Sequence, residues 1–283
     1  MRFELHWLVK TNFFPTREDF SPSLKEICIA TKSSQIGDAL ILTTLPGLLA
    51  QKHPHLKIRT YPRAFNPVVF KNNPHVQGVN YLPSAVFGDD INQGTGHLIH
   101  TKERFFDLPL SQPPKPILYL SEKEKTWAKK YLQKVSLPQD SRPIILIHPW
   151  GKTRNNVLSQ AQWEDLVQKQ NAHFRFFQLG LFGQPQIRGC EQYCFFPKGY
   201  SHARQLFSLV SVAQGFIGVD SGPMHVAQAF NLPSLVFINH QEASPNETFL
   251  YERNTHLQIG NANIPTEVSH FFESIKASAV NNP

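Results

Sequence analysis

The sequence contains little that would place the protein in a membrane or in an oxidising compartment. None of its 283 residues lies in an uninterrupted apolar run of the roughly 18 residues that a bilayer-spanning helix needs. Glu4 and Lys10 interrupt the opening segment where a signal peptide would be apolar, which argues against export. The three cysteines form no even disulfide framework and have no zinc spacing: Cys28, Cys190 and Cys194. We therefore expect a protein of the reducing cytoplasm.

The composition is that of a globular protein with a basic surface. Hydrophobic residues make up 41% of the chain and charged residues 17%, which excludes a disordered tail or a fibre. The length suits two α/β lobes better than a single core. The net charge of +7 favours anionic partners, namely nucleotides, phosphorylated glycans, acidic lipid headgroups or nucleic acid. The densest basic cluster is interpreted as the solvated face of a helix: Lys123, Lys125, Lys129 and Lys130.

Short apolar runs alternate along most of the chain with segments of helical spacing. The apolar runs predict buried strands, and the spaced segments predict amphipathic helices. Their alternation indicates the α/β class, with parallel sheets and crossover helices. We expect strands at 27–30, 56–61, 76–82, 143–148, 174–179, 215–219 and 234–238, and helices at 38–51, 67–72, 121–134, 160–170, 202–212, 223–231 and around 268–275.

Two stretches carry no clear pattern. Residues 1–24 are interpreted as an irregular N-terminal arm, and residues 83–116 are dense in glycine and proline. We expect a lobe boundary within or just after the second stretch, which gives an N-terminal lobe over 1–115 and a C-terminal lobe over 116–283. The helix that opens the C-terminal lobe carries a predicted capping box, formed by Ser121 and Glu124.

The strongest chemical signal is the run Val-Asp-Ser-Gly-Pro-Met-His at 219–225. A strand ends, the chain turns, and Pro223 begins a helix in its preferred first position. Backbone N–H groups and the positive end of the helix dipole would form an anion site there. Gly222 lets a phosphate approach closely, and His225 adds a neutral or charged donor one helical turn further on. The alternative is that the turn only caps the helix, beside an ordinary buried histidine.

A second strand–turn–helix pattern occurs in the first lobe, at Ser33–Asp38. Asp38 stands at a helix N-terminus, where the helix dipole keeps the carboxylate ionised. An ionised carboxylate facing a crevice suits a general base for a sugar or alcohol hydroxyl. The alternative is that Asp38 only stabilises its own helix.

Two nucleotide-binding motifs and a metal site are excluded. Gly151-Lys152-Thr153 follows a strand as in a P-loop, but Leu146 stands where the first glycine is required. The dinucleotide fingerprint is absent because Gly94-x-Gly96 follows no strand and has no third glycine. Two histidine pairs have metal-like spacings without supporting ligands, and we interpret them as surface histidines: His53/His55 and His97/His100.

Taken in order, these motifs resemble the signature of the heptosyltransferases, glycosyltransferase family 9. The last motif is the most specific, because Asp220–Ala229 is close to the family's Asp-Ser-Gly-x-x-His-x-Ala-x-Ala run. The resemblance covers about residues 27–82 and 143–238. The other matching segments are Ser33–Asp38 with Thr43–Pro46, Asn73–Val76, and His148-Pro149 with Trp163.

The resemblance implies a glycosyltransferase with two Rossmann-like lobes (GT-B), whose active site lies in the cleft between them. The first lobe would take the acceptor and the second the nucleotide sugar. The implied reaction is inverting and independent of metal or cofactor, moving a heptose-like sugar from an ADP-sugar to a lipopolysaccharide-type or related glycan. The implied location is cytoplasmic, with room for peripheral contact with the inner membrane. The alternatives are a non-catalytic sugar-nucleotide binder of the same fold and a transferase acting on a modified nucleic-acid base.

By the same resemblance Asp38 is the catalytic base, and Ser34, Gln35 and Gly37 form the acceptor-side turn. The family usually has a lysine before a Trp-Pro pair in the loop after the strand at 143–148, but this sequence has Asn156 or Val157 there. Lys152 or Arg154 is the candidate replacement. The helix N-terminus would stabilise the leaving diphosphate without a metal. The predicted donor diphosphate-binding residues are Asp220, Ser221, Gly222, Met224, His225, Lys152, Thr153 and Arg154.

Overall fold

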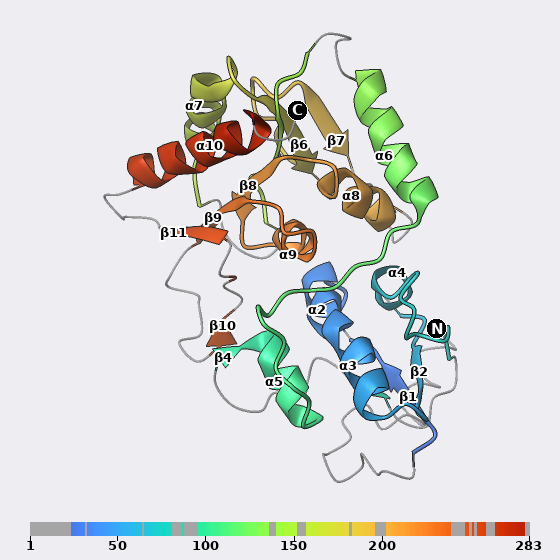
Figure 1. Ribbon diagram of the computed structural model, residues 1–283. Coiled ribbons are helices and arrows are strands. Elements are labelled where there is room, and N and C mark those ends of the chain that lie inside the picture. The colour runs from blue at the N-terminus through green and yellow to red at the C-terminus, as the bar shows by residue number, and fades with distance from the viewer. Residues whose placement is uncertain are drawn as a thin grey trace. The chain divides into compact units, whose positions relative to one another are not determined.

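The computed structural model shows a chain divided into two compact units. One unit consists of residues 1–119 with 244–249, and the other of residues 120–243 with 250–283. Both units have parallel sheets, which confirms the α/β class (Figure 1). None of the helices within the described part of the chain is long and apolar enough to span a bilayer. The described residues are 24–31, 33–63, 65–80, 86–87, 96–135, 140–151, 157–180, 183–195, 202–238, 247–248, 251, 254–258 and 264–280.

The first unit contains a parallel sheet of three described strands in the order β2-β1-β3. The connection from β1 to β2 was predicted as one helix at 38–51, but it consists of α2, the 3₁₀ helix η2 and α3. Pro46 explains the interruption, because it has no N–H to donate to the carbonyl four residues earlier. The bounds are β1 Glu26–Ile29, α2 Ile36–Ile41, η2 Leu42–Thr44, α3 Leu45–Lys52, β2 Lys57–Thr60, α4 Asn66–Val69 and β3 Val86–Phe87.

Two predictions for the first unit are wrong. Residues 76–80, the described part of the expected strand 76–82, form no strand and make one isolated bridge, from Val79 to Thr60; the strand beside β1 is β3. The stretch 83–116 contains β4 (Gly96–His97), which pairs with β10 (Glu247–Thr248), and helix α5 (Leu98–Phe105). His97 is buried, not on the surface, and its ring caps α5 by accepting from Ile99 N–H at 3.2 Å. The buried polar residues of α5 hide the apolar period that would have predicted a helix.

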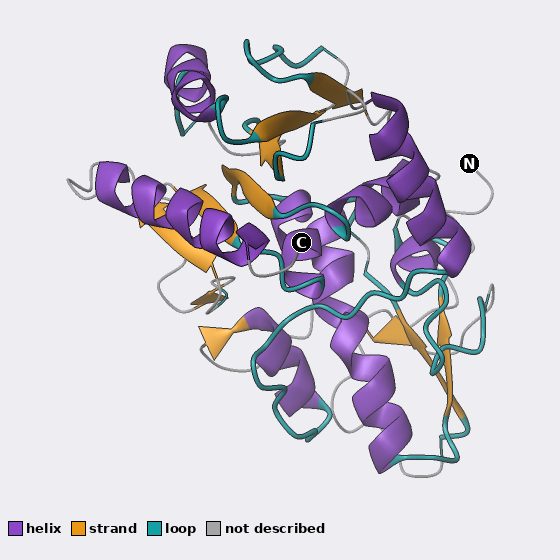
Figure 2. Cartoon of the chain, turned by 45° about the horizontal axis from the view of Figure 1, so that its top comes forward, coloured by secondary structure: helices purple, strands orange, loops and turns teal. Residues whose placement is uncertain are grey.

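The second unit contains a parallel sheet of six described strands in the order β11-β9-β8-β5-β6-β7. Figure 1 shows α7 and α10 on one side of this sheet and α6 and α8 on the other, and Figure 2 shows the same strands flanked by helices. The edge strands β7 and β11 were not predicted. The bounds are α6 Glu122–Val135, β5 Ile144–His148, α7 Gln160–Gln170, β6 Arg175–Gly180, β7 Gln192–Phe195, α8 Ala203–Val210, β8 Gly215–Val219, α9 Gly222–Ala229, β9 Ser234–Ile238, β11 Asn254–Gln258 and α10 Ile264–Val280.

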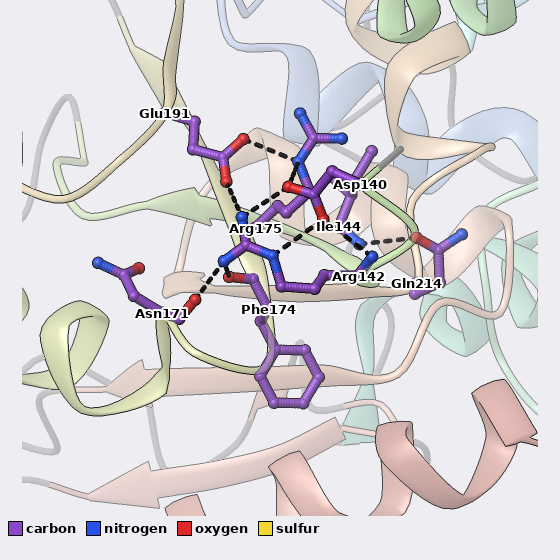
Figure 3. Close-up of polar contacts among 8 residues, drawn as sticks. All are labelled: Asp140, Arg142, Ile144, Asn171, Phe174, Arg175, Glu191 and Gln214. Carbon is purple, nitrogen blue, oxygen red and sulfur yellow. Dashed lines mark hydrogen bonds and ion pairs between the residues drawn. The ribbon is translucent and has the colours of Figure 1, made fainter. Parts of the chain in front are cut away.

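Ion pairs connect residues at the amino ends of neighbouring strands in the second sheet (Figure 3). Arg175 is 2% exposed, and its Nε lies 2.7 Å from Glu191 Oε2 and 3.3 Å from Asp140 Oδ2. Arg142 contacts the same two carboxylates at 2.6 and 2.8 Å. The hydrogen bond from Arg142 lowers the pKa of Asp140 to about 2. These charges stabilise the edge of the sheet opposite to the carboxyl ends of its strands.

The predicted capping box at the start of α6 is present and also joins α6 to α8. Ser121 N–H donates to Glu124 at 2.8 Å, and Glu124 N–H donates to Ser121 Oγ at 3.3 Å. The same carboxylate accepts two hydrogen bonds from Arg204 of α8, at 2.7 and 2.9 Å. The Arg204 guanidinium thereby lowers the pKa of Glu124 to about 2.

The two central strands, β5 and β8, approach closely at Gly218. A Cβ placed there would lie 2.8 Å from the carbonyl oxygen of His148 and 2.8 Å from Cζ of Phe216. We expect Gly218→Ala to lower the free energy of unfolding by about 1–3 kcal/mol, because backbone must shift to admit the methyl group. Denaturant unfolding followed by tryptophan fluorescence measures the change. Gly47→Ala is the control, since its Cβ would make an ordinary 3.6 Å contact. Equal stability of Gly218→Ala and wild type would contradict the close approach.

Candidate functional site

The order of strands in the second sheet reverses between β5 and β8. From β5 the chain continues outward to β6 and β7, whereas from β8 it continues the other way to β9 and β11. In open parallel sheets, ligands bind beyond the carboxyl ends of the strands at such a reversal. Two polar segments leave the sheet here, one at His148–Gly151 after β5 and one at Asp220–Gly222 after β8. The sheet topology therefore marks the turn that the sequence singled out.

The turn after β8 leads into an eight-residue helix, α9. Ser221 occupies the N-cap position, but its side chain does not cap; within the described residues its hydroxyl donates to Val219 O at 3.0 Å. The simple-cap alternative is therefore wrong for Ser221. Pro223 is the second residue of the helix and not the first, because α9 begins at Gly222. The first turn of any helix has N–H groups without partners inside the helix, and these suit an anion.

His225 is buried in this helix and is bound to a residue that the sequence did not indicate. Its Nδ1 lies 2.5 Å from the hydroxyl of Tyr251, and the two rings meet at 86°. Burial lowers the pKa of His225 to about 4, so the ring is neutral near pH 7. Burial, followed by the negative charge of Asp220, raises the pKa of Tyr251 well above its usual value. Burial thus favours the neutral form of His225, one of the two forms that the sequence left open.

The carboxyl end of β5 also holds a buried neutral histidine. His148 Nδ1 lies 3.1 Å from the carbonyl oxygen of Leu179, so this nitrogen carries the proton and donates. Burial lowers the pKa of His148 to about 4. Nearby, Trp150 Nε1 and Gln178 Nε2 both donate to the carbonyl of Pro185, at 3.0 and 2.8 Å. These bonds fix the loops after β5 and β6, and only the His148-Pro149 pair had been noted in the sequence.

The remaining predicted donor residues differ in how the structure places them. Met224 is 2% exposed and its N–H donates to Ser221 O at 3.0 Å, so its side chain lies in the core. Val157, one of the two residues at the position of the family's lysine, is half-buried and packs against the core cluster that contains Trp150 and Trp163. Lys152, Thr153 and Arg154 lie outside the described residues.

The Asp38 turn in the first unit is held by side-chain hydrogen bonds. Asp38 is half-buried in the first turn of α2. Thr31 Oγ1 accepts from Ser33 N–H at 2.9 Å, and Ser33 Oγ accepts from Gln35 N–H at 3.0 Å. The side chain of buried Asn66 binds the backbone of Thr31: its Oδ1 accepts from Thr31 N–H at 2.9 Å, and its Nδ2 donates to Thr31 O at 3.0 Å. Sequence reasoning missed Thr31 and Asn66. The predicted acceptor-side residues Ser34 and Gln35 are exposed, and Gly37 is half-buried.

No metal site emerges at either turn from the part of the chain that the structure describes. No three His, Cys, Asp or Glu side chains among those residues gather closely enough to hold a metal ion. The arrangement that the structure does show is a helix start after β8 in the second unit and a carboxylate in the first turn of a helix in the first.

The neutral state of His225 predicts a pH dependence of stability. The unfolded chain takes up a proton at His225 near pH 6.5, whereas the folded chain does so only near pH 4. The free energy of unfolding therefore falls as the pH decreases from about 6.5 to about 4. The slope of this free energy against pH reports how many more protons the unfolded chain binds than the folded chain. We expect His225→Gln to lower that number by about one, measured by urea unfolding at a series of pH values. His148 has the same shift and keeps part of the slope. An unchanged slope in His225→Gln would show that His225 is protonated in the folded state.

Comparison with known proteins identifies a family that the chain matches. The model of glycosyltransferase family 9 (heptosyltransferase) matches residues 95–263, which is more than half of the chain. No curated protein matches the chain.

Solved structures of that family have the same fold. The glycosyl transferase family 9 protein from Veillonella parvula DSM 2008 is 11% identical with a TM-score of 0.65, and 89% of this chain and 91% of that chain are covered. Escherichia coli ADP-heptose lps heptosyltransferase II is 17% identical with a TM-score of 0.63, over 89% of this chain and 98% of that chain. The dodecameric iron-containing heptosyltransferase TibC of enterotoxigenic Escherichia coli, in complex with ADP-D-beta-D-heptose, is 12% identical with a TM-score of 0.57, over 91% and 78%. This likeness shows the GT-B fold of two Rossmann-like lobes.

Proposed function

This chain belongs to glycosyltransferase family 9, and we propose that it moves a heptose-like sugar from an ADP-linked donor to a glycan hydroxyl. The chain is a glycosyltransferase of heptosyltransferase type; the sugar, the nucleotide and the acceptor are the proposed part. The acceptor class that we propose is lipopolysaccharide or a related phosphorylated glycan. The net charge of +7 suits such an acceptor, because its phosphates are anionic.

The observation that carries the proposal is the turn Asp220–Gly222 at the point where the strand order of the second sheet reverses. We assign the donor diphosphate to the start of α9, where N–H groups and the helix dipole favour negative charge. Charge grows on the diphosphate as it leaves, so this fixed dipole stabilises the transition state more than the ground state. His225 adds a donor that is neutral. One solved neighbour holds ADP-heptose, which supports an ADP-linked donor.

The proposed base is Asp38, at the start of α2 in the first unit. Its carboxylate takes the proton of the acceptor hydroxyl while the hydroxyl oxygen forms a bond to the anomeric carbon. The bond from that carbon to the diphosphate oxygen breaks in the same step, through an oxocarbenium-like transition state. A single displacement of this kind inverts the anomeric configuration. In this scheme residues 1–115 bind the acceptor and residues 116–283 bind the donor.

The proposed reaction needs no metal and no cofactor. Lys152 or Arg154 would supply the positive charge that the family's usual lysine gives to the donor phosphates. We propose a cytoplasmic location, with peripheral contact of the basic surface with the inner membrane. Because the neighbour TibC contains iron, the ADP-binding experiment below is done with and without a metal ion.

Binding of ADP tests the donor site. We expect ADP at about 100 times its dissociation constant to raise the free energy of unfolding by roughly 2.7 kcal/mol. Thermal unfolding with ADP alone, with magnesium and with a chelator measures the shift, and the three should agree. Gly222→Val should abolish the shift, because a branched side chain would crowd the helix start. Absence of any shift with ADP, ADP-sugars or other nucleotides would contradict the proposal. A shift that requires a metal would contradict its metal-independent form.

Turnover tests the base. We expect Asp38→Asn to lower the transfer rate by about 10²–10⁴-fold while ADP binding is retained, because the variant cannot accept the hydroxyl proton. The assay follows ADP release from ADP-heptose in the presence of a lipopolysaccharide inner-core acceptor. Glu122→Gln is the control, since this carboxylate is exposed on α6. Full turnover of Asp38→Asn would mean that Asp38 only stabilises its own helix.

A further inference from the structure

One buried side chain of the second unit has no part in the scheme so far, and it contacts the helix that follows the turn Asp220–Gly222. Tyr251 is 3% exposed and lies 26 residues along the chain from His225. Its hydroxyl is 2.5 Å from His225 Nδ1, on the helix that follows the turn. It is also near enough to Asp220, at the beginning of the turn, for the charge of that residue to act on it.

One hydrogen lies between the Tyr251 oxygen and His225 Nδ1, and the atom that carries it determines the tautomer of the histidine. The tyrosine keeps its proton near pH 7, because burial and then the charge of Asp220 raise its pKa. The imidazole is neutral, because burial lowers the pKa of His225. A neutral imidazole has one N–H and one lone pair. A phenol is a better donor than an imidazole N–H, and an imidazole nitrogen is a better acceptor than a phenol oxygen. The favoured arrangement is therefore the Tyr251 hydroxyl donating to Nδ1.

We infer that Tyr251 is a positioning residue of the donor site, whose hydroxyl holds the His225 ring and keeps the ring proton on Nε2. The inference rests on the proposed assignment of the diphosphate to the turn Asp220–Gly222. A histidine with its proton on Nε2 has an N–H at that nitrogen, and we assign this N–H to an oxygen of the diphosphate; the other tautomer would offer a lone pair there instead. In this proposal Tyr251 determines which of the two His225 offers.

The burial of the pair explains why a hydroxyl is needed at this position. His225 and Tyr251 are 5% and 3% exposed, so water cannot readily replace the bond between them. Phenylalanine at 251 would fill nearly the same volume, but it would leave Nδ1 without this partner. The ring would then lose the bond that selects its tautomer, at little cost in apolar packing.

The tautomer is measured directly by NMR of the full chain labelled with ¹⁵N-histidine. The His225 signals are assigned by their loss in His225→Gln. We expect wild-type Nε2 to carry the hydrogen and Nδ1 to have the shift of a hydrogen-bonded acceptor. In Tyr251→Phe the two nitrogens should move toward the averaged shifts of a mixed tautomer. A proton on Nδ1 in the wild type would overturn the inference, and this reading does not depend on the stability of Tyr251→Phe.

Affinity for ADP tests the consequence. We expect Tyr251→Phe to raise the dissociation constant roughly three- to tenfold, the range for loss of one hydrogen bond. Tyr131→Phe, on α6 of the same unit, is the matched control and should bind ADP as the wild type does. In a double-mutant cycle with His225→Gln, the second substitution should add little, because Tyr251 acts through His225. Fully additive losses would overturn the inference.

The outcomes separate this inference from the proposed function. If the wild type binds ADP and Tyr251→Phe binds it equally well, the role of Tyr251 is wrong and the donor site stands. If the wild type binds no ADP, the donor site is wrong, and the role given to Tyr251 falls with it.

Discussion

The site depends on the contact between two backbones, where β5 and β8 lie side by side in the centre of the second sheet. His148 pairs with Gly218, and a side chain at Gly218 would meet the carbonyl of His148 at 2.8 Å. Because the strand order reverses between them, the loops that follow diverge, and the start of α9 becomes the natural place for an anionic ligand.

The second unit has its partly buried ion-pair network and its candidate site at opposite edges of the sheet. At the amino edge of the sheet, Arg142 and Arg175 neutralise Asp140 and Glu191 in a partly buried network (Figure 3). At the carboxyl edge the two buried histidines are neutral, because burial lowers the pKa of each to about 4. The ion pairs therefore contribute to stability at one edge, while fixed dipoles are left to act at the other.

The sequence predicted the features that depend on local pattern. The strands at 215–219 and 234–238 are as expected, since parallel strands buried on both faces are continuous apolar runs. Helix α5 was missed because buried Lys102 and Glu103 break its apolar period. Within the expected strand 76–82, the described residues 76–80 make a single bridge, from Val79 to Thr60 at the edge of β2, while residues 86–87 pair with β1 on its other side. The turn at Asp220 was visible as a short motif. Tyr251 was not, because nothing in a sequence indicates a hydrogen bond across 26 residues.

A structure of the chain crystallised with ADP tests the central claim most directly. The account predicts the diphosphate at the start of α9, with phosphate oxygens about 2.7–3.2 Å from the backbone N–H groups of Ser221 and Gly222. It also predicts that His225 keeps its contact with Tyr251 in that complex. ADP bound elsewhere on the second unit, or held only through a metal ion with no backbone contact at this turn, would contradict the account.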